Sequence, residues 1–555
     1  MKQEIIEIIR KSLDALGEKS GVPFSVDIEI EIPRDEGMGD LATTVAMRLA
    51  KPLKQSPRKI AEDIAGLIHD LNPRFIENVE IAGPGFINFR LRKEFLYERL
   101  EQLLGEGHSL IRTDIGSGQK IQVEFVSANP TGPLHIGHGR GAAVGNALCN
   151  ILQAAGYDVQ REFYINDAGL QVQLLGRSVF ARYQQLLGND VPFPQDGYQG
   201  DYIETIAAEL RTHEGDKYAA RSFDECGDFF AGYAYKMMLS TITGDLKDFG
   251  VVFDTWQSEK DLHLTGKVKK ALADLESKGL VYKKEGAAWF HSSKFEDDKD
   301  RVVIKQDGEF TYFASDIAYH KDKLDRGFES IIDIWGADHH GYIPRIRSVL
   351  EAFDLPGERF RVILIQMVSL LRHGSPVQMS KRAGTFITLR EVMDEVGADI
   401  AKFIFLTRRA DSHLDFDIDI AKEQSSENPV FYVQYAFARI SSLFRQAEET
   451  GARDQGLGVR EADYTLLKED QELSLIKKLL QYPMVFEGAA LSCEPHRITY
   501  YLQELAGIFH SYYYQHRIIT DDADLSLARL GLCRAVQIVL EDGLKVLGVS
   551  APERM

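Results

Sequence analysis

Apolar and polar positions alternate with two different periods over residues 1–110 of this chain. The opening run MKQEIIEIIRKSLDAL places its apolar residues on one face of a helix. Residues 24–30 alternate with a period of two and predict a half-buried strand. Residues 86–91 do the same after a glycine-rich turn, and a second helix is expected from about residue 41 to 50. The mixture predicts a small N-terminal α+β domain.

Strand-like and helical patterns then alternate regularly over residues 118–400. Residues 121–126 predict a strand, and the small residues at 142–155 predict a helix that Gly156 ends. Residues 159–163 predict the next strand. This βαβ order indicates an α/β fold with a Rossmann-like parallel sheet.

The apolar and polar pattern over the rest of the chain predicts two more strands, an insertion and a helical bundle. Apolar runs at residues 331–335 and 362–365 predict two further strands of the parallel sheet. Between about residues 187 and 300 the alternation weakens and charge rises, so this stretch is interpreted as an insertion. Residues 425–555 show helical periodicity almost throughout and predict a C-terminal α-helical bundle.

Composition limits the class of protein. The four cysteines lie far apart and form no C-x-x-C pair, so we expect neither a disulfide framework nor a structural metal. No apolar run approaches the roughly 20 residues of a membrane helix, and the N-terminus lacks a secretory signal. We therefore expect a cytoplasmic protein without membrane contact. The formal charge of −19 argues against a nonspecific nucleic-acid coat but leaves room for local basic patches.

One candidate phosphate site lies between the predicted strand at 121–126 and the helix that follows. Backbone N–H groups at such a junction attract phosphate. Two histidines at i and i+3 could stabilise charge on one α-phosphate, and the glycine between them would let an adenine ring approach. A chance histidine pair, or half of a metal site, is the alternative. The segment comprises Ser127, Ala128, Asn129, Pro130, Thr131, Gly132, Pro133, Leu134, His135, Ile136, Gly137 and His138.

A second candidate site is the run Met379-Ser380-Lys381-Arg382. Adjacent lysine and arginine on a loop can neutralise the β- and γ-phosphates of ATP, which makes pyrophosphate a better leaving group. Such a turn on its own is more often a solvated surface loop. Paired with the two-histidine segment, it fits one active site with two phosphate-binding elements.

Together these two segments resemble the class I aminoacyl-tRNA synthetases. The first matches the family's HIGH signature and the second its KMSKS signature, in which Gln378 replaces the first lysine and Lys381 keeps the second. A third run, Gly336-Ala337-Asp338-His339-His340, is similar to the loop of this family that meets the adenosine and the amino acid. The resemblance implies catalytic roles for His135, His138, Ser380 and Lys381, and ATP contacts for Gly137, Gly336, Met379 and Arg382.

Arginine is the amino acid that the sequence favours. Tyr312 and Asp316 share one face of a predicted helix, so the carboxylate could pair with a guanidinium while the phenol closes over it. A capping aspartate beside a core tyrosine is the alternative. The run that precedes His135 is similar to the form found in arginyl-tRNA synthetases. That resemblance implies arginine contacts for Ser127, Asn129, Tyr312, Asp316 and Asp338.

The two ends of the chain resemble the RNA-binding parts of the same family. Residues 1–110 look like its tRNA-elbow-binding domain, in which Lys51, Lys54 and Arg58 form a basic cluster. Residues 425–555 resemble its helical anticodon-binding domain. Tyr435 and Arg439 combine a ring with a cation there, a set that can stack splayed bases. A solvated helix face and ordinary core packing are the respective alternatives.

The resemblance as a whole implies an arginine–tRNA ligase. ATP with Mg²⁺ would activate L-arginine to arginyl-adenylate, and the arginyl group would pass to the 3′-terminal adenosine of tRNA(Arg). We expect the phosphates and water to carry the Mg²⁺. The resemblance also implies that arginine is activated only with tRNA bound, and we expect a monomer. Three alternatives stay open: a small-molecule nucleotidyltransferase, a catalytically silent RNA-binding relative, and a synthetase for another amino acid.

Overall fold

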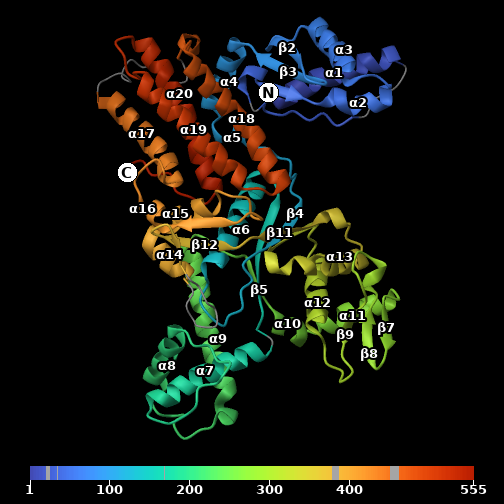
Figure 1. Cartoon of the computed structure of the whole chain (residues 1–555), viewed down its shortest axis with the longest axis vertical. Helices are drawn as coiled ribbons and strands as arrows, with labels where there is room; N and C mark the ends of the chain where they lie inside the picture. Colours follow the sequence, from blue (N-terminus) through green and yellow to red (C-terminus); the bar gives the residue numbers. More distant parts are fainter. Residues whose placement is uncertain (21–25, 34, 168, 378–386, 450–461) are drawn as a thin grey trace.

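The N-terminal α+β block, the parallel sheet and the helical bundle that the sequence predicts are all present and follow one another along the molecule (Figure 1). The structure, drawn in Figure 1, is a computed structural model of the chain. The bundle and the N-terminal block lie side by side at one end, and the sheet lies below them. The structure describes residues 1–20, 26–33, 35–167, 169–377, 387–449 and 462–555.

The N-terminal block is a three-stranded antiparallel sheet covered by helices. Its strand order is β1-β3-β2, and the turn predicted before residue 86 connects β2 to β3. The predicted first helix is confirmed. The second begins later than expected, because residues 41–43 pair with β3 before the chain turns into α2. The elements are α1 (Lys2–Ser20), β1 (Leu41–Thr43), α2 (Val45–Leu53), α3 (Pro57–Leu71), β2 (Ile76–Ala82) and β3 (Phe86–Leu91).

The strand predicted at residues 24–30 is wrong for the part that the structure describes. Residues 26–30 form no strand, and one isolated bridge joins Glu31 to Ala42. Ile28 and Ile30 are nevertheless buried, so the alternating apolar pattern predicted their burial correctly. No ladder extends beyond that one bridge, whereas β1 pairs with β3 over all three of its residues.

The main sheet has five parallel strands in the order β11-β10-β4-β5-β6. Helix α6 (Ile136–Ala154) connects β4 to β5 and ends before Gly156, which has a φ of +88° and caps it as predicted. All five carboxyl ends meet at one edge, where parallel sheets bind ligands. The strands are β4 (Lys120–Glu124), β5 (Asp158–Ile165), β6 (Thr255–Ser258), β10 (Ser330–Gly336) and β11 (Phe360–Ile365).

Between β5 and β10 the chain forms two further substructures, each with its own apolar core. Three long helices pack around a core of their own, and a small antiparallel sheet packs with α11 and α12 around another. Strand β6 lies within the stretch expected to be an insertion, yet it forms the edge of the main sheet. The elements are α7 (Leu170–Leu186), α8 (Asp201–Glu214), α9 (Phe223–Asp248), α10 (Glu259–Leu264), α11 (Lys267–Ser277), β7 (Val281–Lys284), β8 (Ala287–Phe290), β9 (Arg301–Ile304) and α12 (Tyr312–Asp325).

The chain after β10 leads from the sheet to the bundle. Strands β12 and β14 pair in parallel, and short helices lie against them. The elements are η3 (Ala337–Tyr342), α13 (Ile343–Ala352), β12 (Val368–Arg372), β13 (Ser375–Pro376), α14 (Leu389–Val396), α15 (Ala398–Phe405), β14 (Leu414–Asp417) and α16 (Ile418–Lys422).

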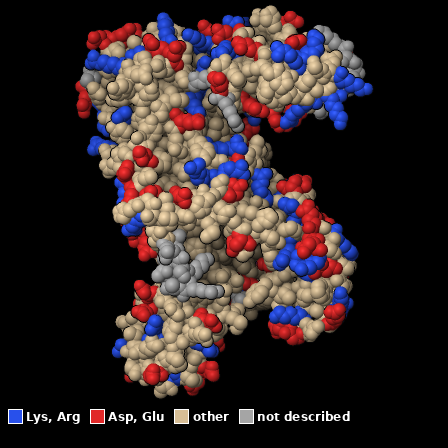
Figure 2. Space-filling model, in the orientation of Figure 1, with Lys and Arg blue, Asp and Glu red and all other residues tan. Residues whose placement is uncertain are grey.

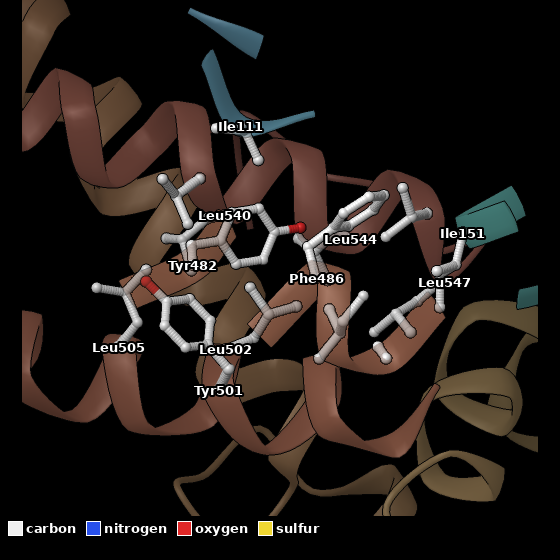
Figure 3. Close-up of a cluster of buried hydrophobic side chains, with 14 of the residues drawn as sticks. Ile111, Ile151, Tyr482, Phe486, Tyr501, Leu502, Leu505, Leu540, Leu544 and Leu547 are labelled. Atoms are coloured by element: carbon white, nitrogen blue, oxygen red, sulfur yellow. The ribbon is translucent and has the colours of Figure 1, made fainter. Parts of the chain in front are cut away.

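Four long helices form the C-terminal bundle. Figure 3 shows its apolar core, in which Tyr482, Phe486 and Tyr501 lie among leucines of the neighbouring helices. Ile111 and Ile151 reach the same core from α5 and α6, so the bundle is fused to the helix that follows β4. No helix among the described residues is long and apolar enough to cross a membrane. The four bundle helices are α17 (Pro429–Glu449), α18 (Asp470–Ser492), α19 (His496–Gln515) and α20 (Ala523–Val546). Two helices that precede β4, α4 (Lys93–Glu106) and α5 (His108–Ile111), pack against α18 and α20.

Candidate active site

The two histidines of the first candidate segment form one unit at the start of α6. His135 is the N-cap residue, and the Gly137 N–H donates to its Nδ1 at 3.1 Å. The His135 N–H in turn donates to His138 Nδ1 at 3.3 Å. The two rings stack with their centroids 3.7 Å apart. Both imidazoles therefore lie at the positive end of the helix dipole, where an anion is favoured.

The chain that leads into this unit leaves β4 through two residues in the left-handed region. Val126 has a φ of +69° and Ser127 a φ of +40°. A β-branched residue there costs about 1–3 kcal/mol, and such strain collects at functional sites. Hydrogen bonds hold the turn: the Ser127 hydroxyl donates to Glu124 at 2.9 Å and accepts from the Tyr164 N–H at 3.1 Å.

The stretch that follows the second candidate segment is hydrogen-bonded to the first segment. Met379, Ser380, Lys381 and Arg382 lie outside the described residues. The chain is described again from Ile387, whose carbonyl accepts from the Ile136 N–H at 3.2 Å. The Leu389 N–H donates to the Leu134 carbonyl at 2.7 Å. The stretch that directly follows the lysine-bearing segment is thus paired with the backbone of the histidine segment.

The predicted arginine contacts lie on and around α12. Asp316 is half-buried and accepts a hydrogen bond from the Tyr342 hydroxyl. Burial raises the pKa of Asp316, and the bond from Tyr342 opposes that rise. Tyr312 is 71% exposed, and its hydroxyl lies 3.8 Å from where a Cβ on Gly169 would stand. Asp338 lies on η3 with its carboxylate 82% exposed, outside the buried part of this region.

A row of buried charges anchors α12 to the sheet. Asp333, Glu124 and Glu162 are in register on the neighbouring strands β10, β4 and β5. The Lys323 ammonium lies 2.7 Å from Glu124 and 2.9 Å from Asp333, and Arg326 donates to Glu162 at 2.9 Å. Burial opposes the charge of Lys323, but the attraction of Asp333 and Glu124 outweighs it and raises the pKa. The ion pairs hold the face of α12 that carries the predicted arginine contacts.

Sequence reasoning missed this row and one further acid. Glu259, the first residue of α10, is only 4% exposed. Burial raises its pKa to about 7, nearby Asp316 and Asp167 add to the rise, and hydrogen bonds from Ser315 and Tyr164 oppose it. The buried charges could have been suspected from the sequence, because charged residues interrupt the apolar runs at 121–126 and 331–335. Nothing in the sequence marks Glu259 as unusual, because an acidic residue is common in the first turn of a helix.

The predicted RNA contacts lie away from this site. Lys51, Lys54 and Arg58 are exposed on the N-terminal block, and Figure 2 shows Lys and Arg side chains around the end of that block where α2 lies. On the bundle, the Arg439 guanidinium lies 4.4 Å from the centre of the Tyr435 ring and donates to its hydroxyl at 2.8 Å. The visible face is hollowed between the N-terminal block and the region of α13 (Figure 2).

Metal-binding groups are scarce in the described part of the chain. No cluster of three or more His, Cys, Asp or Glu residues there could hold a metal ion. Each of the four cysteines is buried as a free thiol, and burial raises the pKa of Cys149 and of Cys533 to about 12. These two thiols therefore stay protonated near neutral pH.

Three family models match consecutive parts of the chain. The model "Arginyl tRNA synthetase N terminal domain" matches residues 3–91. The model "tRNA synthetases class I (R), catalytic domain" matches residues 99–409, and "DALR anticodon binding domain" matches residues 433–555. The central match spans the parallel sheet and both candidate phosphate segments.

Curated relatives match over the full length. The arginine–tRNA ligase of Syntrophotalea carbinolica is 50% identical over 557 residues, with 100% of both chains covered. That of Bacillus licheniformis is 47% identical and covers 100% of this chain and 98% of its own. Among solved structures, the Thermus thermophilus arginyl-tRNA synthetase has a TM-score of 0.78 at 22% identity, with 100% of both chains covered, and shares the fold.

Proposed function

The chain belongs to the arginyl-tRNA synthetase family, and we propose that its active site lies where the loop before α6 meets the start of α14 and of α12. It is an arginine–tRNA ligase that consumes ATP. The observation that carries the site assignment is the backbone pairing of residues 134–136 with residues 387–389. That pairing supports one site for both phosphate motifs, since each motif adjoins one of the two paired stretches.

In the first step, a carboxylate oxygen of arginine attacks the α-phosphorus of ATP. The bond from that phosphorus to the bridging oxygen breaks, and pyrophosphate leaves. His135 and His138 stabilise the charge that develops on the α-phosphate at the N-terminus of α6. Lys381 and Ser380 hold the departing pyrophosphate. Adenosine lies against Gly137 and Gly336, and Met379 and Arg382 complete the ATP contacts.

In the second step, a ribose hydroxyl of the terminal adenosine of tRNA attacks the carbonyl carbon of arginyl-adenylate. The bond between that carbon and the phosphate oxygen breaks, the hydroxyl proton passes to solvent, and AMP leaves. Only positioning is required of the protein here, because the mixed anhydride is already activated.

Arginine recognition rests on charge. Asp316 pairs with the guanidinium, and Tyr312 closes over it from the exposed rim of the pocket. Ser127 and Asn129 contact the amino-acid end from the strained loop. Asp338 contacts the substrate only where the pocket opens to solvent, because its carboxylate is exposed.

ATP enters with Mg²⁺, which its phosphates and water molecules carry. Mg²⁺ keeps several waters and is usually bound through substrate phosphates plus one or two carboxylates. Among the described residues, no group of three or more His, Cys, Asp or Glu residues could hold a metal ion by itself.

The outer blocks receive the tRNA. The domain of residues 1–110 contacts the elbow through Lys51, Lys54 and Arg58, and the domain of residues 425–555 contacts the anticodon through Tyr435 and Arg439. The exposed positions of the three cations support the first contact. The ring–cation stack on the bundle supports the second. The enzyme acts as a monomer in the cytoplasm.

The assignment is tested by tRNA-supplemented ATP–pyrophosphate exchange with each of the twenty amino acids in turn. Arginine alone should support exchange, because only a guanidinium matches the acidic pocket in charge and shape. A parallel reaction without tRNA serves as the control and should show little exchange. Exchange driven by another amino acid, or full exchange without tRNA, would count against the assignment.

A further inference from the structure

One tyrosine connects a unit of three helices to the loop that carries the histidine pair. Helices α7, α8 and α9 form this three-helix unit, which lies at the end of the molecule opposite the N-terminal block (Figure 1). Tyr202, the second residue of α8, packs against the apolar core that the three helices share. Its hydroxyl donates to the Thr131 carbonyl at 2.8 Å, in the loop that leads to His135. The unit is therefore hydrogen-bonded to the loop between β4 and α6.

Two glycines leave the room that this contact needs. A Cβ on Gly132, the residue after Thr131, would stand 3.2 Å from the Tyr202 hydroxyl oxygen, and a Cβ on Gly200 would stand 2.5 Å from the Tyr202 ring. Burial raises the pKa of the Tyr202 phenol, so the phenol keeps its proton near neutral pH and donates it to the Thr131 carbonyl. The side chain is thus closely surrounded and bonded to one backbone acceptor.

The hydrogen bond from Tyr202 lies between two other attachments of this loop. At the start of the loop, the Ser127 hydroxyl is hydrogen-bonded to β4 and β5. At its end, residues 134–136 pair with residues 387–389. Thr131 lies between these attachments, so its bond to Tyr202 fixes the middle of the loop against a different part of the molecule.

The same three-helix unit also contacts α14, the helix that follows residues 387 and 388. Arg390 of α14 forms ion pairs with Asp245 at 2.8 Å and with Asp248 at 2.7 Å, both on α9. Helices α8 and α9 belong to one unit, because each packs against α7 around the shared core. Their contacts therefore hold the histidine loop and α14 against one body.

We propose that Tyr202 is a positioning residue for adenylate formation, because its hydroxyl fixes the Thr131 carbonyl and with it the loop that presents His135 and His138 to ATP. The inference rests on the proposed function of the two histidines. Tyr202 acts through the backbone of the loop and contacts neither ATP nor arginine. A misplacement of about 1 Å can slow catalysis about 100-fold, so one hydrogen bond at this distance from the substrates affects the rate.

The test measures ATP–pyrophosphate exchange by the full-length enzyme with tRNA, ATP and arginine at saturation. Tyr202→Phe keeps the ring and removes only the hydroxyl. Its kcat should fall about tenfold, because the histidines are no longer held in place for the charge that develops on the α-phosphate. The arginine KM should change less than about threefold, because Asp316 lies on α12 and Ser127 keeps its own bonds to β4 and β5.

Tyr183→Phe is the matched control. The Tyr183 hydroxyl donates to the Gly215 carbonyl at 2.7 Å, so this variant also removes a hydrogen bond between a tyrosine and a backbone carbonyl, but within the three-helix unit. Because Tyr183 is fully buried, the thermal unfolding midpoint should fall at least as much as in Tyr202→Phe, while kcat should stay within about twofold. An equal fall in kcat in both variants would overturn the inference, since it would mark a general loosening of the unit.

A double-mutant cycle with His138 tests the route of the effect. In a His138→Ala background, Tyr202→Phe should slow exchange about threefold or less, because one of the two groups that it positions is gone. A full tenfold effect in that background would overturn the inference, as would an unchanged kcat in Tyr202→Phe alone. Failure of the proposed function is separate, because His138→Ala by itself would then leave exchange unchanged.

Discussion

Single residues in this site divide into charges that the protein pairs internally and charges that it leaves for substrates. Lys323 forms ion pairs with Glu124 and Asp333, and these hold α12 against the main sheet. Among the described residues, no lysine or arginine forms an ion pair with Asp316, the residue that we propose pairs with the guanidinium. His135 and His138 lie at the N-terminus of α6, where a bound anion would balance the positive end of the helix dipole.

Lys381 should matter for rate far more than for arginine binding. Replacing it by alanine removes the charge that we propose stabilises departing pyrophosphate, so exchange should slow about 100-fold or more while the arginine KM changes little. ATP–pyrophosphate exchange with tRNA present measures both quantities. Gln378→Ala is the control, because it alters the same segment without removing a charge. A proportional rise in arginine KM with unchanged turnover would refute this role.

At this scale the sequence predicted the histidine pair and its place at the start of α6 correctly. It did not predict the ion pairs of Glu124, Lys323 and Asp333. Glu124 and Asp333 stand out as charges inside apolar runs, but neither run shows which residue the charge pairs with. Their pairing depends on the register of β4 against β10 and on where α12 crosses the sheet, which only tertiary structure decides.

Among the elements, the pairing of residues 134–136 with residues 387–389 holds the two motif-bearing parts together. Leu389 is the first residue of α14, and its N–H is directed at Leu134 and away from the helix's own carbonyls. A proline at such a position fits a helix, and Thr388 already has the extended backbone that proline requires before it.

Leu389→Pro should therefore slow adenylate formation about fivefold more than Leu389→Ala does, which corresponds to one hydrogen bond of about 1 kcal/mol. Both variants remove the same buried side chain, and only proline removes the N–H. Single-turnover adenylate formation gives the rates, and the thermal unfolding midpoints show whether both variants are folded to the same extent. Equal rates in the two variants would show that the hydrogen bond does not position the site.

Periodicity predicted most strands and helices because each buries one face. It failed at residues 26–30, where Ile28 and Ile30 are buried but form no strand. It also placed β6 in an insertion, because that strand is four residues long and half-buried throughout. Burial is visible in a single sequence, whereas hydrogen-bond partners are not.

Across the whole molecule, the two blocks expected to bind tRNA pack against each other, and the bundle also packs onto the catalytic region. The Tyr97 hydroxyl of α4 donates to the Leu467 carbonyl before α18 at 2.8 Å. Arg112 pairs with the buried Asp542 of α20 at 3.2 Å. The bundle core reaches Ile151 on α6, the helix that begins at the histidine pair (Figure 3). This docking joins segments far apart in the sequence, so no local pattern could predict it.

The central claim is that both motifs and the acidic pocket enclose one set of substrates. A crystal structure with ATP, arginine and tRNA bound measures this directly. We predict that an imidazole nitrogen of His135 or His138 and the Lys381 ammonium lie within about 3.5 Å of the same triphosphate, with Asp316 equally close to the guanidinium. A triphosphate contacted by only one of the two motifs, or a guanidinium bound away from α12, would contradict it.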